Sequence, residues 1–328
     1  MGVCLSSDPK KVFIVGVPRS GTTWMLMLMA QHPAVVGVQQ GSLFHALEPL
    51  GRWWTSKHGY GKRLVKHSDE SNSGDEQGGR LFIGDVLRPE ELVDLCRPLV
   101  DHVMRKICEA SGALIVVDQT PENMDLADTI LRLVPDAYFV HVVRDPRAVF
   151  CSLRSANSSW AGKFPAGPAA AGRLWTTYMA KADALRASTD RYLEVRYEDL
   201  LQRGPQELAR IFEWLELPAD AALCHQAVQN CSIDKLRKAA VAPPSFFRKG
   251  EAAGWREEAS HGQIRCIEYL AGKQMQEMGY ATVSKNLARR PLRLAMQDAL
   301  RGAAGPILRN VGGRLRALKR RVQLLGGI

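Results

Sequence analysis

Long hydrophobic runs are missing from this chain of 328 residues. No stretch approaches the roughly 18 uninterrupted apolar residues of a membrane-spanning helix, and the first residues lack the basic start, apolar core and cleavage site of a secretion signal. The composition, 46% hydrophobic and 24% charged, is typical of a globular protein and excludes the disordered and fibrous classes. We therefore expect a globular, cytoplasmic protein.

Paired cysteines are missing as well. The seven cysteines are an odd number, they are widely spread, and none belongs to a C-x-x-C pair or to a His cluster at metal-ligand spacing. This pattern predicts reduced thiols, and it predicts neither a disulfide framework nor a bound metal.

Excess charge is confined to one end of the chain. The segment 285–328 contains eleven lysines and arginines against one acidic residue, Asp298, and therefore carries the whole formal net charge of +10. Its apolar residues recur at near-helical spacing, which is typical of interfacial helices on anionic membranes. We predict a globular domain over 1–284 and a basic amphipathic tail over 285–328. Docked helices, a dimerisation element or a nucleic-acid-binding arm are the alternatives for the tail, although no nucleic-acid partner is expected.

Short, continuous apolar runs alternate with helical patterns. Such runs indicate strands that are buried on both faces, and they occupy 12–17, 113–117, 137–143 and 192–195. Between them, 89–110 predicts a helix with Leu92, Leu95, Leu99, Val103 and Ile107 on its buried face and Gly112 as its C-cap. Two further stretches, 68–79 and 161–172, predict loops. The alternation favours an α/β fold of three layers, in which helices flank a central parallel sheet.

The first predicted strand leads into a phosphate-binding loop. Gly16 to Thr23 reads GVPRSGTT, the G-x-x-x-x-G frame between a strand and a helix, where backbone N–H groups and the helix dipole attract anions. In nucleotide triphosphatases a lysine follows the second glycine, but here Thr22 occupies that position and the cation is Arg19. The loop therefore suits a phosphate ester without metal better than ATP with magnesium.

The loop also carries a family resemblance. PRSGTTW, from Pro18 to Trp24, resembles the 5′-phosphosulfate loop of sulfotransferases that use 3′-phosphoadenosine 5′-phosphosulfate (PAPS). VVRDPRAVFCSLRS, at 142–155, resembles their 3′-phosphate motif, with its arginine at Arg144 and its serine at Ser152. A guanidinium fork and a hydroxyl suit a dianionic phosphate. The alternative is a structural ion pair between Arg144 and Asp145.

Two later segments extend the resemblance, which combines features of bacterial, carbohydrate-type and cytosolic-type members. VRYEDL resembles the segment whose tyrosine lies near the adenine, and FFRKGEAAGW, at 246–255, resembles the segment that closes over the 3′-phosphate. Trp24 is expected to stack on the adenine, while Cys231 stands where cytosolic-type members have a threonine. The resemblance implies that PAPS contacts Arg19, Ser20, Gly21, Thr22, Thr23, Trp24, Arg144, Ser152, Tyr197, Arg248, Lys249 and Gly250.

The catalytic base departs from the family pattern. Gln39 and Gln40 lie where the protein-tyrosine and carbohydrate branches have a glutamate, and Gln119 replaces a lysine of bacterial members. Histidine titrates near pH ~6.5, so His45 is the first candidate for the base. Asp118, Glu48 and Glu122 are the others. We expect Arg19 to stabilise developing negative charge, with His45 or Asp118 accepting the proton.

Together these features predict the transfer of a sulfonate group from PAPS to a hydroxyl or amine, without a metal. A lipid, a carbohydrate or another small molecule is expected as the acceptor, and an enzyme with this tail is expected in the cytoplasm or peripherally at the inner membrane face. A P-loop kinase and a non-catalytic nucleotide-binding, membrane-associated protein are the alternatives. The sequence identifies neither the acceptor nor the oligomeric state.

Overall fold

The computed structural model describes residues 8–39, 41–48, 89–159, 161, 164, 167–238, 246, 252–284 and 291. In this part of the chain, five parallel strands form one sheet in the order β2-β3-β1-β4-β5. They are β1 (Lys10–Val15), β2 (Val35–Gln39), β3 (Ile115–Gln119), β4 (Tyr138–Val143) and β5 (Tyr192–Arg196). Four of the strands match the predicted apolar runs to within two residues at every boundary. The fifth, β2, was not predicted.

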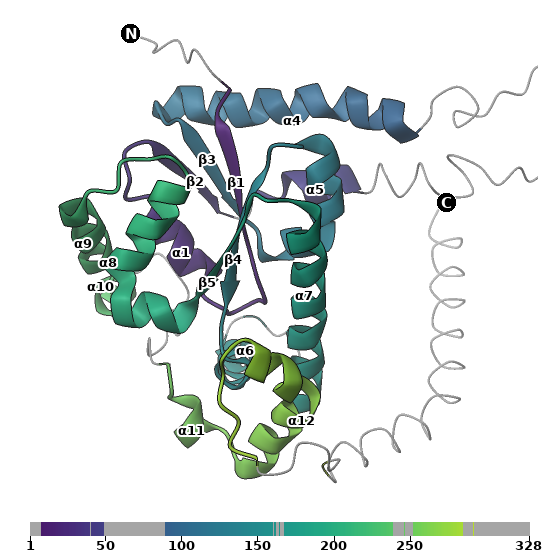
Figure 1. Ribbon diagram of the computed structural model, residues 1–328, viewed down its shortest axis with the longest axis vertical. Helices are drawn as coiled ribbons and strands as arrows, with labels where there is room; N and C mark the ends of the chain where they lie inside the picture. The colour runs from purple at the N-terminus through teal and green to yellow at the C-terminus, as the bar shows by residue number, and fades with distance from the viewer. Residues whose placement is uncertain are drawn as a thin grey trace, which may run out of the picture.

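Helices cover both faces of the sheet (Figure 1). One face packs against α1 (Thr22–Met29), α8 (Tyr197–Trp214) and α9 (Ala221–Asn230), with the short α10 (Ile233–Lys238) beside them. The other face packs against α4 (Pro89–Ser111), α5 (Ala127–Leu133), α6 (Pro146–Ser159) and α7 (Pro168–Ser188). The helices α11 (Trp255–Glu258) and α12 (His261–Glu277) extend this core by packing on α6 and α7. A 3-10 helix, η2 (Pro121–Leu126), follows β3. The expected three-layer α/β fold is confirmed.

The strands feed two separate cores because their side chains alternate between the faces. Phe13 and Val15 of β1 join the core under α7 and α12, whereas Val12 and Ile14 join the core under α1 and α8. Burial on both faces explains why the strands are continuous apolar runs. After β1 the chain forms β2 and β3 on one side of β1, and it then forms β4 and β5 on the other side. Such a switch point, here between β1 and β4, places a ligand crevice at the carboxyl ends of these strands.

The predicted buried face of α4 is wrong in its central part. Leu95 and Leu99 are 64% and 49% exposed, whereas Val100, Met104 and Cys108 are buried against the sheet. The leucine stripe lies about one residue around the helix from the stripe that is buried, so periodicity alone chose the wrong one of two neighbouring faces. Gly112 ends the helix at φ +72°, as its predicted role as C-cap requires.

The remaining sequence-based expectations are resolved only in part. The loop predicted over 161–172 is shorter, because α7 already begins at Pro168, and the loop predicted over 68–79 lies outside the described residues. The six described cysteines are free thiols. No described helix is both long and apolar enough to span a membrane. The tail, 285–328, is outside the described part apart from Pro291.

Candidate active site

The phosphate loop connects the carboxyl end of β1 to the amino end of α1. Arg19 has a left-handed backbone, φ +75°, which is uncommon for a residue with a side chain and is a form of strain found at functional sites. Gly21, at φ +107°, lies so close to Tyr197 that a Cβ atom would stand 2.5 Å from its ring. The tight turn and the close approach together fix the loop against α8.

Two buried polar atoms, one in this loop and one beside it, have no hydrogen-bond partner among the described residues. The Oγ of Ser20 is fully buried and, among the described residues, accepts and donates no hydrogen bond. The Nε of Arg144, which directly follows β4, is also buried and has no hydrogen-bond partner among these residues. Unpartnered buried polar groups are costly and rare, and a bound anion would satisfy both. The donors present therefore fit phosphate groups.

Four predicted residues from four elements meet here. Arg19 donates from Nε to Ser152 Oγ at 3.3 Å, and Arg144 donates to the backbone oxygen of Arg19 at 3.3 Å. The guanidinium of Arg144 lies 4.1 Å from the centre of the Tyr197 ring. Two arginines and a hydroxyl thus converge at the switch point between β1 and β4.

Contacts within the protein fix the aromatic side chains of the site before a ligand binds. The rings of Trp24 and Tyr197 meet edge to face with centroids 5.4 Å apart, and the indole Nε1 donates to the backbone oxygen of Cys231 at 2.8 Å. Trp24 is buried, so its orientation is fixed by these contacts. Cys231 does lie beside Trp24, and the Cys231 thiol itself contacts the Met27 backbone oxygen at 3.3 Å.

Gln119 binds the phosphate loop directly, a role that the sequence did not indicate. Its Nε2 donates to Thr22 Oγ1 at 3.1 Å, and Thr23 Oγ1 donates to its Oε1 at 3.4 Å. The register that sets Gln119 beside Ile14 brings the amide to the start of α1. A neutral side chain therefore holds both threonine hydroxyls where bacterial members of the resembled family have a lysine.

Two of the candidate bases lie close together. Asp118, at the end of β3, is buried and accepts hydrogen bonds from Thr120 Oγ1 at 2.8 Å and Asn123 Nδ2 at 3.3 Å. Burial raises the pKa of Asp118, while these hydrogen bonds and the nearby charge of His45 act in the opposite direction. His45 lies in the helical segment 43–48, and its Nδ1 is buried without a hydrogen-bond partner among the described residues.

The other candidates are placed less favourably. Glu122 is exposed on η2, where its charge acts on Tyr178 of α7. Gln39 is exposed at the end of β2, in register with Gln119. Packing fixes the segment that carries His45 and Glu48, because the ring of Phe44 meets that of Phe13 edge to face at 5.3 Å.

Comparisons with known proteins agree with this geometry. A family model described as "Sulfotransferase family" matches residues 9–221, which is well over half of the chain. This chain belongs to the sulfotransferase family. It is 24% identical over 302 residues to nodulation protein NoeE of Sinorhizobium fredii (strain NBRC 101917 / NGR234), covering 84% of this chain and 67% of that protein. It is 26% identical over 222 residues to a putative protein-tyrosine sulfotransferase of Caenorhabditis briggsae, covering 67% and 70%.

The fold also matches a solved sulfotransferase. The crystal structure of mouse SULT7A1, complexed with PAP, superposes with a TM-score of 0.51 over 81% of this chain and 85% of that chain, at 14% identity. The similarity supports the same α/β architecture. The resemblance read from the two phosphate motifs is thereby confirmed at the level of the family, and the chain is a sulfotransferase.

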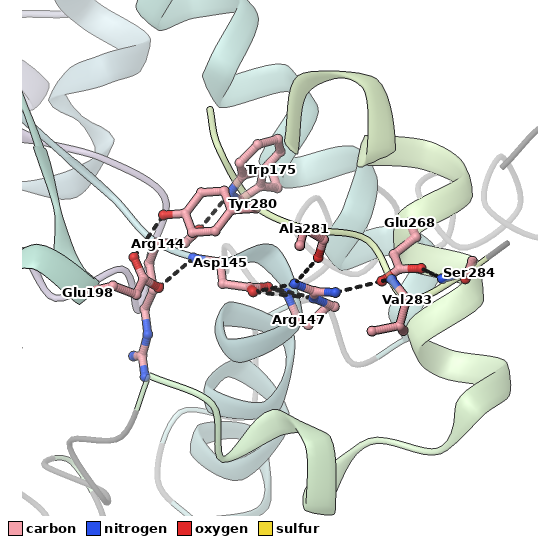
Figure 2. Close-up of polar contacts among 10 residues, drawn as sticks. All are labelled: Arg144, Asp145, Arg147, Trp175, Glu198, Glu268, Tyr280, Ala281, Val283 and Ser284. Atoms are coloured by element: carbon pink, nitrogen blue, oxygen red, sulfur yellow. Dashed lines mark hydrogen bonds and ion pairs between the residues drawn. The ribbon is translucent and has the colours of Figure 1, made fainter. Parts of the chain in front are cut away.

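The alternative ion pair at the second motif is not formed. The Asp145 carboxylate pairs with Arg147 at 2.7 Å instead of with Arg144 (Figure 2). This leaves the Arg144 guanidinium directed toward the phosphate loop. Among the described residues, no group of three or more His, Cys, Asp or Glu side chains could hold a metal ion.

The late segment reaches the site at Phe246, and its Trp255 packs on Arg147 of the neighbouring motif. Arg19 donates to the Phe246 backbone oxygen at 2.6 Å, and its guanidinium lies 4.6 Å from the centre of the Phe246 ring. At the other end, Trp255 lies 3.7 Å from the Arg147 guanidinium. Arg248, Lys249 and Gly250 lie outside the described residues, so their contact with PAPS stays a prediction.

Proposed function

We propose that this sulfotransferase transfers the sulfonate group of PAPS to a hydroxyl or amine of an acceptor. The observation that carries the proposal is the convergence of Arg19 and Arg144, from two different strand ends, beside two buried polar atoms that have no hydrogen-bond partner in the described part of the chain. The donors of the phosphate loop, including Arg19, suit the 5′-phosphosulfate, and Arg144 with Ser152 suits the 3′-phosphate. That the mouse structure was crystallised with PAP supports the same donor for this chain.

The residues divide the chemical work between them. Arg19, Ser20 and the backbone of the loop stabilise negative charge on the leaving phosphate, while Arg144 and Ser152 hold the 3′-phosphate. The acceptor oxygen attacks sulfur as the bond from sulfur to the phosphate oxygen breaks. His45 accepts the acceptor's proton, and the buried carboxylate of Asp118 stabilises the imidazolium that forms. The products are the sulfated acceptor, adenosine 3′,5′-bisphosphate and a proton that His45 releases to water.

A kinase activity is less compatible with the loop. Thr22 stands where a nucleotide triphosphatase has its lysine, and its hydroxyl is bound by Gln119. Thermal unfolding separates the two functions: adenosine 3′,5′-bisphosphate without magnesium should raise the melting temperature, and ATP with magnesium should not. The reverse result would favour a kinase. Turnover of PAPS then distinguishes an enzyme from a non-catalytic nucleotide-binding protein.

The acceptor class is proposed from the sequence and the relatives' names. Lipids, carbohydrates and small molecules are the first group to test, and protein tyrosine is added because three relatives are named protein-tyrosine sulfotransferases. Comparing sulfated metabolites with and without the enzyme identifies the acceptor. An enzyme that sulfates none of these classes despite binding PAPS would contradict the proposal.

We also propose that the tail holds the enzyme at an anionic membrane. Each basic residue near such a surface contributes up to about 1 kcal/mol, so partial engagement is sufficient. A chain ending at Ser284 retains every described contact of residues 280–284 and is therefore the appropriate comparison. Salt-sensitive flotation of the full-length chain alone on anionic vesicles supports the proposal, and equal flotation of the two chains contradicts it.

A further inference from the structure

We propose that Arg147 and Glu268 form a positioning unit that fixes the 3′-phosphate loop in the geometry in which Arg144 binds phosphate. This inference rests on the proposed function, because it assumes that Arg144 holds the 3′-phosphate. Neither residue belongs to the predicted nucleotide contacts. The unit connects the start of α6 to the segment 280–284, which follows α12 (Figure 2).

All three guanidinium nitrogens of Arg147 donate to protein partners. It makes a bidentate pair with the Asp145 carboxylate, at 2.9 Å from Nε and 2.7 Å from Nη2, and donates to Glu268 at 2.6 Å. It also donates to the Ala281 backbone oxygen at 3.0 Å. Burial opposes the positive charge, but Asp145 and Glu268 outweigh it and raise the pKa of Arg147. The guanidinium is therefore a permanent cation, and each of its nitrogens is held by a protein acceptor.

Glu268 connects this cation to the segment that follows α12. Its carboxylate is fully buried and accepts from the backbone N–H of Val283 at 3.0 Å and of Ser284 at 2.8 Å, besides Arg147. The Glu268 side chain thus joins α12 directly to the segment 281–284 and, through Arg147, to Asp145. Asp145 is the residue next to Arg144.

A second connection holds the same loop from the opposite side. Tyr280 donates from its hydroxyl to Glu198 at 2.8 Å, and Glu198 accepts from the backbone N–H of Asp145 at 3.0 Å. The backbone oxygen of Arg144 accepts from Trp175 Nε1 at 2.9 Å. The peptide group between Arg144 and Asp145 is therefore held at its C=O and at its N–H, and the Asp145 side chain is held by Arg147. The Nε of Arg144 itself is buried and has no hydrogen-bond partner among the residues that the structure describes.

These hydrogen bonds fix the backbone beside Arg144 and leave its side chain for a ligand, as a preorganised anion site requires. A guanidinium binds a phosphate most tightly when its backbone does not have to be ordered on binding. Burying two carboxylates with one guanidinium is not the most stabilising use of this volume, because apolar residues of similar size often stabilise as well or better. The positioning of Arg144 accounts for the retention of charge at this place.

The test compares two nucleotides that differ only in the 3′-phosphate, adenosine 3′,5′-bisphosphate and adenosine 5′-monophosphate. In calorimetry, Glu268→Gln in the full chain should lower the affinity for the bisphosphate about tenfold and change the affinity for the monophosphate by less than about twofold. A loss of this size is typical when a hydrogen-bonded partner that orients a binding side chain is removed. The KM for PAPS should rise by a similar factor, with kcat nearly unchanged. If Glu268→Gln does not fold, Arg147→Lys should reproduce the selective loss, because it keeps the charge but cannot form the bidentate pair with Asp145.

Lys11→Met is the matched control. The buried Lys11 ammonium pairs with Asp101 at 2.9 Å near the amino end of β1, whereas the phosphate loop follows the carboxyl end of the same strand. The variant therefore disrupts a comparable ion pair without touching the loop. It should lower stability and leave the ratio of the two affinities unchanged. Equal losses for both nucleotides in Glu268→Gln, or no loss for either, would overturn the positioning role. If Arg144→Ala also fails to distinguish the nucleotides, the proposed 3′-phosphate site itself is wrong.

Discussion

Gly21→Ala tests whether the phosphate loop depends on its contact with Tyr197. At φ +107° the new side chain costs about 1–3 kcal/mol in backbone strain. The added Cβ would also lie 2.5 Å from Tyr197 Cδ2, and relieving such an overlap in a packed site costs about 1–3 kcal/mol more. The expected loss of unfolding free energy is therefore about 2–6 kcal/mol.

Gly112→Ala isolates the second contribution. Gly112 also has a left-handed backbone, φ +72°, but a Cβ there meets no atom within 4 Å. Both variants remove the same freedom from the unfolded chain, so that effect cancels between them. The difference between the two losses then reports mainly the displacement of Tyr197.

Urea unfolding and calorimetry with adenosine 3′,5′-bisphosphate are the assays. Gly21→Ala should lose more stability than Gly112→Ala and should also lose nucleotide affinity, because the ring that it displaces lies under the Arg144 guanidinium. Gly112→Ala should bind the nucleotide normally. If the two variants are equally stable and bind alike, the contact between loop and ring does not support the site.

Three further substitutions test separate parts of the site. Arg144→Ala should weaken adenosine 3′,5′-bisphosphate by about 1.5–3 kcal/mol and hardly affect adenosine 5′-phosphosulfate, whereas equal losses in calorimetry would refute the 3′-phosphate assignment. His45→Ala should lower turnover ~10²–10⁴-fold with nucleotide affinity intact; turnover within a few fold of normal would make His45 a packing residue. Asp118→Asn should lose activity but gain stability at neutral pH, since burial raises the pKa of Asp118 and makes its ionised form costly. That gain should disappear in unfolding experiments near pH ~3.9 and below, where the aspartate is protonated in both states, so a gain that grows with acidity would contradict it.

Much of the fold could be predicted because the strands lie in the middle of a sheet that is covered on both faces. In an α/β pattern, a short continuous apolar run such as 12–17 fits a buried strand far better than a surface helix. The strand β2 was missed because VVGVQ is short, contains a glycine and leaves Gly37 and Gln39 exposed. On α4, the sequence contained two adjacent apolar stripes, and only packing against the sheet distinguished them.

The site divides in a similar way. Arg19, Arg144 and Ser152 belong to local motifs, so the residues could be named before their distances were known. The bonds from Gln119 to the threonines depend on the register between β1 and β3, which no local pattern determines. Arg147 and Glu268 lie 121 positions apart, and their pairing follows from where α12 packs on α6.

The same contacts explain how a phosphate site tolerates the carboxylates of its own motifs. RDPR and YED place Asp145, Glu198 and Asp199 within one residue or two of Arg144 and Tyr197, where free negative charge would repel a nucleotide. Each is occupied by a protein partner: Asp145 pairs with Arg147, Asp199 with Arg203 at 3.2 Å, and Glu198 accepts from Tyr280 and the Asp145 backbone. Burial also raises the pKa of Glu198, which favours its neutral form. The guanidinium of Arg144 therefore remains the uncompensated charge of this group, and it lies beside the loop in which the phosphate is expected.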